Sequence, residues 1–237
     1  MKLYVYCLAE TIEALTAPVV GISGENVELV KVHDFSLLVS RFTGESAPVT
    51  RENVLTHDNV VRSVLNETTP LPFRFGSVVT EQQLDSYLNA HRAGLKAKLA
   101  QVRGCVEMSV KIISNTDLKE ITETGVADGP GTRFLQEKRH EILGGERRSE
   151  EAKQIAAWLS EQLAPYVEQE EVSLCPTEKL IVAAAHLVSR DQLAQYRDRL
   201  ADARKTRPEL HFLVSGPWPP YTFSNIGLEV KTRFGVS

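Results

Sequence analysis

The feature that most constrains the fold is an order of predicted strands and helices that occurs twice along the 237 residues. Alternating or β-branched runs predict strands, and apolar stripes at helical spacing predict helices. Residues 3–79 give the order β, short α, β, β, α, β, and residues 105–215 give β, α, β, β, α, β. This order is typical of the ferredoxin-like unit, in which an antiparallel sheet carries both helices on one face.

We therefore predict an α+β protein with two ferredoxin-like (βαββαβ) units joined by an amphipathic helix. The short helix of the first unit is expected over residues 9–16, and the strand at 179–188 contains an Ala-rich run that would also suit a helix. The predicted domains are an N-terminal ferredoxin-like domain at 1–80, a connecting helix at 81–102, a C-terminal ferredoxin-like domain at 103–216 and a C-terminal tail at 217–237.

Composition narrows the class of protein. Hydrophobic residues make up 42% and charged residues 24%, as in ordinary globular domains. The net charge of −4 disfavours a nucleic-acid partner held by charge. Cys7, Cys105 and Cys175 form no C-x-x-C pair, so we expect free thiols in a reducing cytosol. The longest apolar run, 180–188, is about half of a membrane-spanning helix, so no membrane span is expected.

The histidines and glycines form no recognisable catalytic pattern. The sequence lacks H-E-x-x-H, G-x-S-x-G and the phosphate-binding glycine loops. We interpret His186 and His211, which lie on predicted strands, as buried and hydrogen-bonded. Adjacent on a predicted helix, His57 and Asp58 should diverge on the surface and form no dyad. We predict no catalytic site, no metal and no cofactor.

Two aromatic–proline segments stand out, and each closes one predicted unit. They are Leu-Pro-Phe-Arg-Phe-Gly at 71–76 and Gly-Pro-Trp-Pro-Pro-Tyr-Thr-Phe at 216–223. Because proline removes backbone donors, neither segment suits a central strand, and Pro70 and Pro72 predict an edge strand. Residues 218–221 should be extended and polyproline-like. The aromatic side chains either fill the end of a sheet or a domain interface, or form a surface for a partner.

The partner-binding interpretation rests on the chemistry of these side chains. Strand alternation would place Phe73 and Phe75 on one face and Arg74 on the other. Aromatic residues and arginine are enriched among the residues that dominate interface energies. The candidate partner-binding residues are therefore Phe73, Arg74, Phe75, Trp218 and Tyr221.

The two segments, together with Tyr4-Val5-Tyr6, resemble the gas vesicle protein F/L family in order and spacing over nearly the whole chain. The resemblance implies an accessory protein of gas vesicle assembly, located in the cytoplasm and at the gas vesicle. It also implies two kinds of partner, the small hydrophobic shell protein and other gas vesicle accessory proteins, and a chaperone, nucleation or minor structural role. The family is not known for catalytic residues, so the resemblance implies no enzyme activity.

Physical chemistry makes such a helper plausible, because a shell subunit with a large apolar surface is insoluble before assembly. We expect the first unit to contact the shell protein, with Phe73, Arg74 and Phe75 at the contact. One alternative is an α+β-barrel-type small-molecule enzyme, since paired ferredoxin-like units also build such enzymes. An RNA-binding module is disfavoured, because the candidate inner strand at 36–42 lacks the basic and aromatic RNA-binding pattern.

Overall fold

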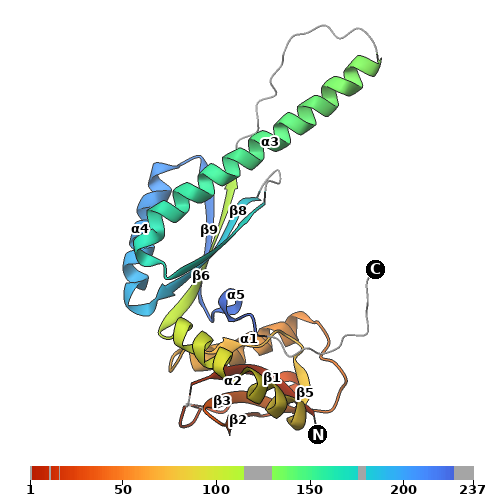
Figure 1. Cartoon of the computed structure of the whole chain (residues 1–237), viewed down its shortest axis with the longest axis vertical. Coiled ribbons are helices and arrows are strands. Elements are labelled where there is room, and N and C mark those ends of the chain that lie inside the picture. The colour runs from red at the N-terminus through yellow and green to blue at the C-terminus, as the bar shows by residue number, and fades with distance from the viewer. Residues whose placement is uncertain (1, 11, 16, 115–129, 176–179, 227–237) are drawn as a thin grey trace. The chain divides into compact units, whose positions relative to one another are not determined.

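The computed structural model describes residues 2–10, 12–15, 17–114, 130–175 and 180–226. It is an α+β protein with two antiparallel sheets, each with its own helices (Figure 1). Contacts divide the chain into two units. The first unit comprises Met1–Glu107 together with Pro217–Ser237, and the second comprises Met108–Gly216. The predicted connecting helix and the described part of the predicted tail thus group with the first unit. Residues 227–237 lie outside the described part of the chain.

The first sheet contains five strands in the order β2-β3-β1-β4, and β5 also pairs with β1. Each described pairing in this sheet is antiparallel. The register between β1 and β3 shifts by one residue between Val5 and Cys7, so Tyr6 is the extra residue of a β-bulge. The strands are β1 (Lys2–Ala9), β2 (Val27–Val32), β3 (Phe35–Phe42), β4 (Leu71–Pro72) and β5 (Val78–Thr80).

The short helix predicted over residues 9–16 is wrong, since the described residues of that stretch contain no helix. A single 3-10 turn, η1 (Ile22–Gly24), follows it. Side chains of the sheet bind the backbone of this connection instead. The amide of Ile12 donates to Ser36 Oγ at 3.0 Å, and the amide of Ile22 donates to the Tyr6 hydroxyl at 2.7 Å. A helix of two turns gains too little from its own hydrogen bonds to displace such contacts.

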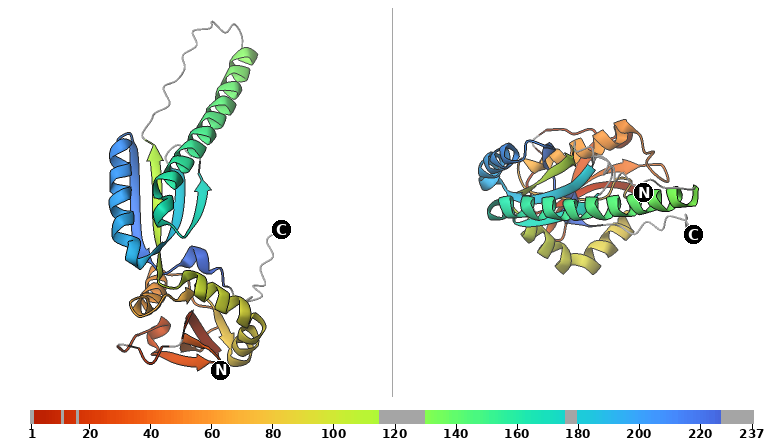
Figure 2. Two further views of the ribbon diagram at one scale, coloured as in Figure 1. Left: turned by 60° about the vertical axis from the view of Figure 1, so that its left-hand side comes forward. Right: turned by 90° about the horizontal axis from the view of Figure 1, so that it is seen from above.

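Two capped helices pack on the first sheet. Helix α1 (Arg51–Leu65) begins after Thr50, whose side chain accepts from the amide of Asn53, and α2 (Glu81–Val102) begins with a Thr80–Gln83 capping box. The α2 bounds match the prediction. The two helices lie on opposite sides of this sheet (Figure 2).

Strand alternation accounts for the burial of both faces. Tyr4 and Tyr6 pack in one cluster with the α1 residues Val60 and Val64. Val5 points to the opposite face and is fully buried there, on the side where α2 contacts β1 and β5. The helix predicted as a connector therefore also covers the second face of this sheet.

The predicted strand at 71–79 is interrupted. It pairs as β4 and β5 around a β-turn at 74–77, in which the amide of Ser77 donates to the Arg74 carbonyl at 3.2 Å. Gly76 has φ +84°, which this turn requires and which glycine adopts without strain. As predicted from the prolines, β4 lies at the edge of the sheet.

The second sheet has four strands in the order β7-β8-β6-β9. The strand prediction at 179–188 is confirmed by β8, and α3 runs as one continuous helix through Gly144 and Gly145. The elements are β6 (Cys105–Ser114), α3 (Pro130–Leu163), the 3-10 turns η2 (Ala164–Tyr166) and η3 (Arg190–Gln192), β7 (Gln169–Leu174), β8 (Leu180–Ser189), α4 (Leu193–Thr206) and β9 (Leu210–Trp218).

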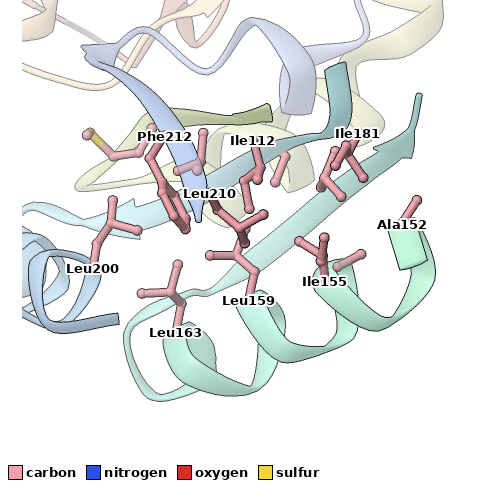
Figure 3. Packing of buried hydrophobic residues seen from close by; sticks show 14 of the residues in the cluster. Ile112, Ala152, Ile155, Leu159, Leu163, Ile181, Leu200, Leu210 and Phe212 are labelled. Carbon is pink, nitrogen blue, oxygen red and sulfur yellow. The ribbon is translucent and has the colours of Figure 1, made fainter. Parts of the chain in front are cut away.

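An aliphatic core lies between this sheet and its two helices. The α3 residues Ile155, Leu159 and Leu163 face Ile112 of β6 and Leu210 of β9 (Figure 3). Residues of α4 join the same cluster, so both helices cover one face of the sheet. The α3 residues at helical spacing thus form the surface that builds this core.

Candidate partner-binding site

The two aromatic–proline segments meet in the first unit. Phe73 and Ile226 form an isolated parallel β-bridge at the edge of the sheet. Beside it, Ser224 Oγ donates to the Pro72 carbonyl at 3.3 Å, and Arg74 Nη2 donates to Asn225 Oδ1 at 3.4 Å. Residues separated by about 150 positions in the sequence therefore share one surface.

We call residues 217–226 the strap. Pro217 and Trp218 continue β9, and a short helix, α5 (Tyr221–Ser224), follows the two prolines. The predicted extended conformation thus ends at Pro220. The amide of Ser224 donates to the Pro220 carbonyl at 2.9 Å, and Asn225 ends the helix in the left-handed region with φ 33°.

A buried carboxylate and a lysine hold the strap. Glu107 Oε2 accepts from the amide of Thr222 and Glu107 Oε1 accepts from the Thr222 hydroxyl, both at 2.8 Å. Burial raises the pKa of Glu107, and the two hydrogen bonds from Thr222 oppose that shift. From α2, Lys98 Nζ donates to the carbonyls of Ser224 at 2.7 Å and Asn225 at 3.1 Å.

A second set of contacts joins the strap to α1. Arg62 Nε donates to Asp58 Oδ2 at 2.6 Å, and the Arg62 guanidinium lies 3.8 Å from the centroid of the Trp218 ring. The Tyr221 hydroxyl donates to Asp58 Oδ1 at 3.2 Å. Burial, followed by the charge of Asp58, raises the pKa of Tyr221. Asp58 therefore helps to hold the strap against α1, because it accepts hydrogen bonds from both Arg62 and Tyr221.

The interpretation of His57 as a surface residue is wrong, because His57 is buried beneath this surface. Its Nδ1 lies 3.0 Å from the Tyr4 hydroxyl. The same hydroxyl accepts a hydrogen bond from the amide of Gly76 at 3.0 Å. The centroid of the Phe75 ring lies 5.9 Å from the centroid of the His57 ring. Burial lowers the pKa of His57 to about 4, against the opposing effects of the Phe73 carbonyl and the Asp58 charge. His57 and Asp58 do diverge, as predicted.

The five predicted site residues differ in their exposure. Phe73 is 0% exposed and its ring packs against Tyr87 of α2, whereas Phe75 packs against Tyr4 and His57. The prediction that Phe73 and Phe75 share a face is wrong, because residues 74–77 form a turn instead of continuing the strand.

The other predicted residues reach the surface to different degrees. Arg74 is exposed, while Phe75, Trp218 and Tyr221 are half-buried. A pocket of about 200 Å³ lies between the edge and the strap. It is lined by Pro72, Phe73, Arg74, Tyr221, Thr222, Ser224, Asn225 and Ile226.

No sequence pattern identified the residues that hold the strap. Glu107 occupies a polar position of an alternating strand and looks like a solvent-facing residue. Lys98 is one of several charged residues on an amphipathic helix. Their roles depend on contacts with a segment more than 100 positions away.

The two histidines that were predicted to be buried on strands of the second unit differ in their exposure. His186 is buried, with Nδ1 2.7 Å from the Tyr196 hydroxyl and Nε2 3.2 Å from Glu170 Oε1, so its predicted role is confirmed. The expected burial of His211 is wrong, because its side chain is exposed on β9. The described residues contain no group of three or more His, Cys, Asp or Glu placed to hold a metal ion. No helix in the described ranges is long and apolar enough to cross a membrane.

Several known proteins are similar to this chain in sequence or structure. The Gas vesicle protein F1 of Halobacterium salinarum is 28% identical over 239 residues, which cover 99% of this chain and 98% of the relative. The Gas vesicle protein L1 of the same organism is 27% identical over 256 residues, covering 93% and 89%. A crystal structure of the gas vesicle protein GvpF from Anabaena sp. PCC7120 matches with a TM-score of 0.79 at 22% identity, over 95% of this chain and 98% of that one.

The structural likeness, at that identity, shows the fold. The family is shown by a family model described as Gas vesicle synthesis protein GvpL/GvpF, which matches residues 2–225. The match includes both aromatic–proline segments and the Tyr4-Val5-Tyr6 strand, the residues on which the resemblance was based. This chain belongs to the gas vesicle synthesis protein GvpL/GvpF family.

Proposed function

We propose that the chain acts in gas vesicle assembly by binding the small hydrophobic shell protein through its first unit. The observation that carries the proposal is the convergence of the two aromatic–proline segments at one edge of the first sheet. Arg74, Phe75, Trp218 and Tyr221 are the proposed contact residues. Phe73 supports them from below, because it has no exposed surface of its own.

The chemistry of this surface suits an apolar partner. Half-buried aromatic rings offer apolar area without the cost of ordering flexible side chains. Arg74 uses one guanidinium nitrogen on Asn225, and its other donors can bind a carbonyl or carboxylate that fixes the register of the partner. Covering an apolar shell subunit in this way would keep it from aggregating before assembly.

The cellular context follows from the same proposal. The chain would meet its partners, the shell protein and other accessory proteins, in the cytoplasm and at the growing vesicle. A binding role is favoured over the small-molecule enzyme because the potential acid–base groups of the second unit are bound to each other. His186 lies between Tyr196 and Glu170, and both His186 and Tyr196 are fully buried.

We also infer that both units are ferredoxin-like. In the first unit β1 lies between β3 and β4, and β2 lies at one edge. In the second unit β6 lies between β8 and β9 in the same way, and β7 lies at one edge. The second unit has both helices of the βαββαβ order. The first unit has an irregular connection and η1 in place of the first helix.

The test of the proposed function is capture of the shell protein by the purified chain. The Arg74→Ala variant should lose most of the binding and keep its melting temperature, because Arg74 is exposed and its loss leaves the core intact. Arg41→Ala, an exposed arginine on β3 of the same unit, is the matched control and should bind normally. Unchanged binding by Arg74→Ala, or equal losses in both variants, would contradict the proposed site.

A further inference from the structure

The strap covers the edge of the first sheet with little backbone pairing. Among the described residues, its ladder contact with that edge is the single bridge between Phe73 and Ile226. The other bonds that hold the strap use side chains. Ser224 binds Pro72, Arg74 binds Asn225, Tyr221 binds Asp58, Lys98 binds two strap carbonyls and Glu107 binds Thr222. A sheet edge can pair with another extended chain, and because β4 is only two residues long and contains Pro72, such a chain would use the few backbone groups around Phe73.

Packing between the strap and the edge is also incomplete. The pocket of about 200 Å³ lies between them, so part of the facing surface lacks contacts. Holding the strap also requires burying the Glu107 carboxylate, which costs free energy that the two bonds from Thr222 offset in part. Segments held in this way open more readily than a continuous sheet.

We propose that the strap is an internal competitor that occupies the docking edge for an extended segment of the shell protein. The incoming segment pairs with the Pro72–Arg74 edge and places an aliphatic side chain where Ile226 is buried. Tyr221 then leaves Asp58 and becomes available to the partner. This inference rests on the proposed function, because it assigns the mode of binding at the same edge.

The competition predicts a rise in affinity when the strap is weakened. If only the open state binds, the apparent Kd equals the intrinsic Kd divided by the open fraction. Lys98→Met removes the bonds to the Ser224 and Asn225 carbonyls, and losing such charged hydrogen bonds should raise a small open fraction about tenfold.

The experiment measures shell-protein binding to wild type, Lys98→Met and Lys96→Met, with a thermal melt of each. Lys96 lies on the same helix but binds Asp34 at the surface, so Lys96→Met is the matched control. We expect about tenfold tighter binding by Lys98→Met and unchanged binding by Lys96→Met. Faster hydrogen exchange of the Thr222 and Ser224 amides in free Lys98→Met should accompany the gain. A peptide of residues 217–226 should compete with the shell protein, and a scrambled peptide should not.

Two results would overturn the inference and leave the proposed function intact. Equal affinities of the two variants would show that the strap does not compete, and weaker binding by Lys98→Met would show that the closed strap is part of the docking surface. If Lys98→Met melts early, Thr222→Val replaces it, because that change removes only the hydroxyl bond to Glu107. A wild type that fails to bind the shell protein would instead contradict the proposed function itself.

Discussion

The two units share a strand order but differ in what covers the sheet beside the connection after the first strand. In the second unit, α3 and α4 close a mainly aliphatic core, which also includes Tyr196 and Phe212, over one face of the sheet. The described residues between β1 and β2 of the first unit form only the 3-10 turn η1, and Tyr4 and Tyr6 pack with α1 on that side of the sheet. Their hydroxyls bind the backbone of the neighbouring loops through the amides of Gly76 and Ile22.

This difference bears on the position of the first aromatic–proline segment. A helix needs no help from the sheet to satisfy its backbone, whereas an irregular connection needs partners for each buried amide. The tyrosines supply those partners, and the 74–77 turn is anchored on one of them. The hydrogen-bonded core therefore positions the proposed site, and four experiments test this contrast.

The largest effect should come from a cavity in the second unit. Leu159→Ala removes a fully buried side chain at the centre of the aliphatic core, and the free energy of unfolding should fall by about 4 kcal/mol. Denaturant titration measures the change. Leu213→Ala, at a position 57% exposed on β9, should change stability little. Equal effects of the two changes would argue against a close-packed core between α3, α4 and the sheet.

A pH titration should affect the first unit through His57. The pKa of His57 is lowered from 6.5 to about 4, so the unfolded chain binds a proton between these values and the native chain does not. The contribution of His57 to stability should therefore fall by about 3 kcal/mol as the pH drops from about 6.5 to about 4. Burial also lowers the pKa of His186, so His57→Gln should reduce the slope in this range without removing it, and His91→Gln, an exposed control on α2, should leave the slope unchanged. A wild-type profile without this slope would contradict the buried neutral imidazole.

Removing one hydroxyl tests the hydrogen-bonded core directly. Tyr6→Phe keeps the ring and leaves the buried amide of Ile22 and Ser40 Oγ without this partner, at a cost of about 2 kcal/mol. Tyr166→Phe, at a half-buried position of the second unit, serves as the control. If Tyr6→Phe loses no more stability than Tyr166→Phe, Tyr6 contributes to stability only through the packing of its ring.

The smallest effect should come from the contact between α1 and the strap. Arg62→Met removes the charge over the Trp218 ring and the bond to Asp58, and should lower stability by about 1 kcal/mol. Because the chain has only two tryptophans, Trp158→Phe isolates the emission of Trp218, which should change in Arg62→Met. Unchanged Trp218 emission would contradict the stacking geometry.

More of the fold than of the site could be predicted from the sequence. Local patterns fixed the α2 bounds, most strands of both sheets and the edge position of β4, because periodicity and proline act on neighbouring residues. The missing helix at 9–16 was not predictable in this way, since the amide of Ile12 is bound by Ser36 from a different element. The role of Glu107 could not be predicted for the same reason, because its partner Thr222 lies beside it only in the folded chain.

Hydrogen–deuterium exchange of the full chain, alone and with the shell protein, would show whether the shell protein contacts the first unit at the edge beside the strap. We expect slower exchange at residues 71–77 in the complex, with residues 180–189 and 210–215 of the second unit unchanged. Slower exchange confined to the second unit, with no change at residues 71–77, would rule out a contact at this edge.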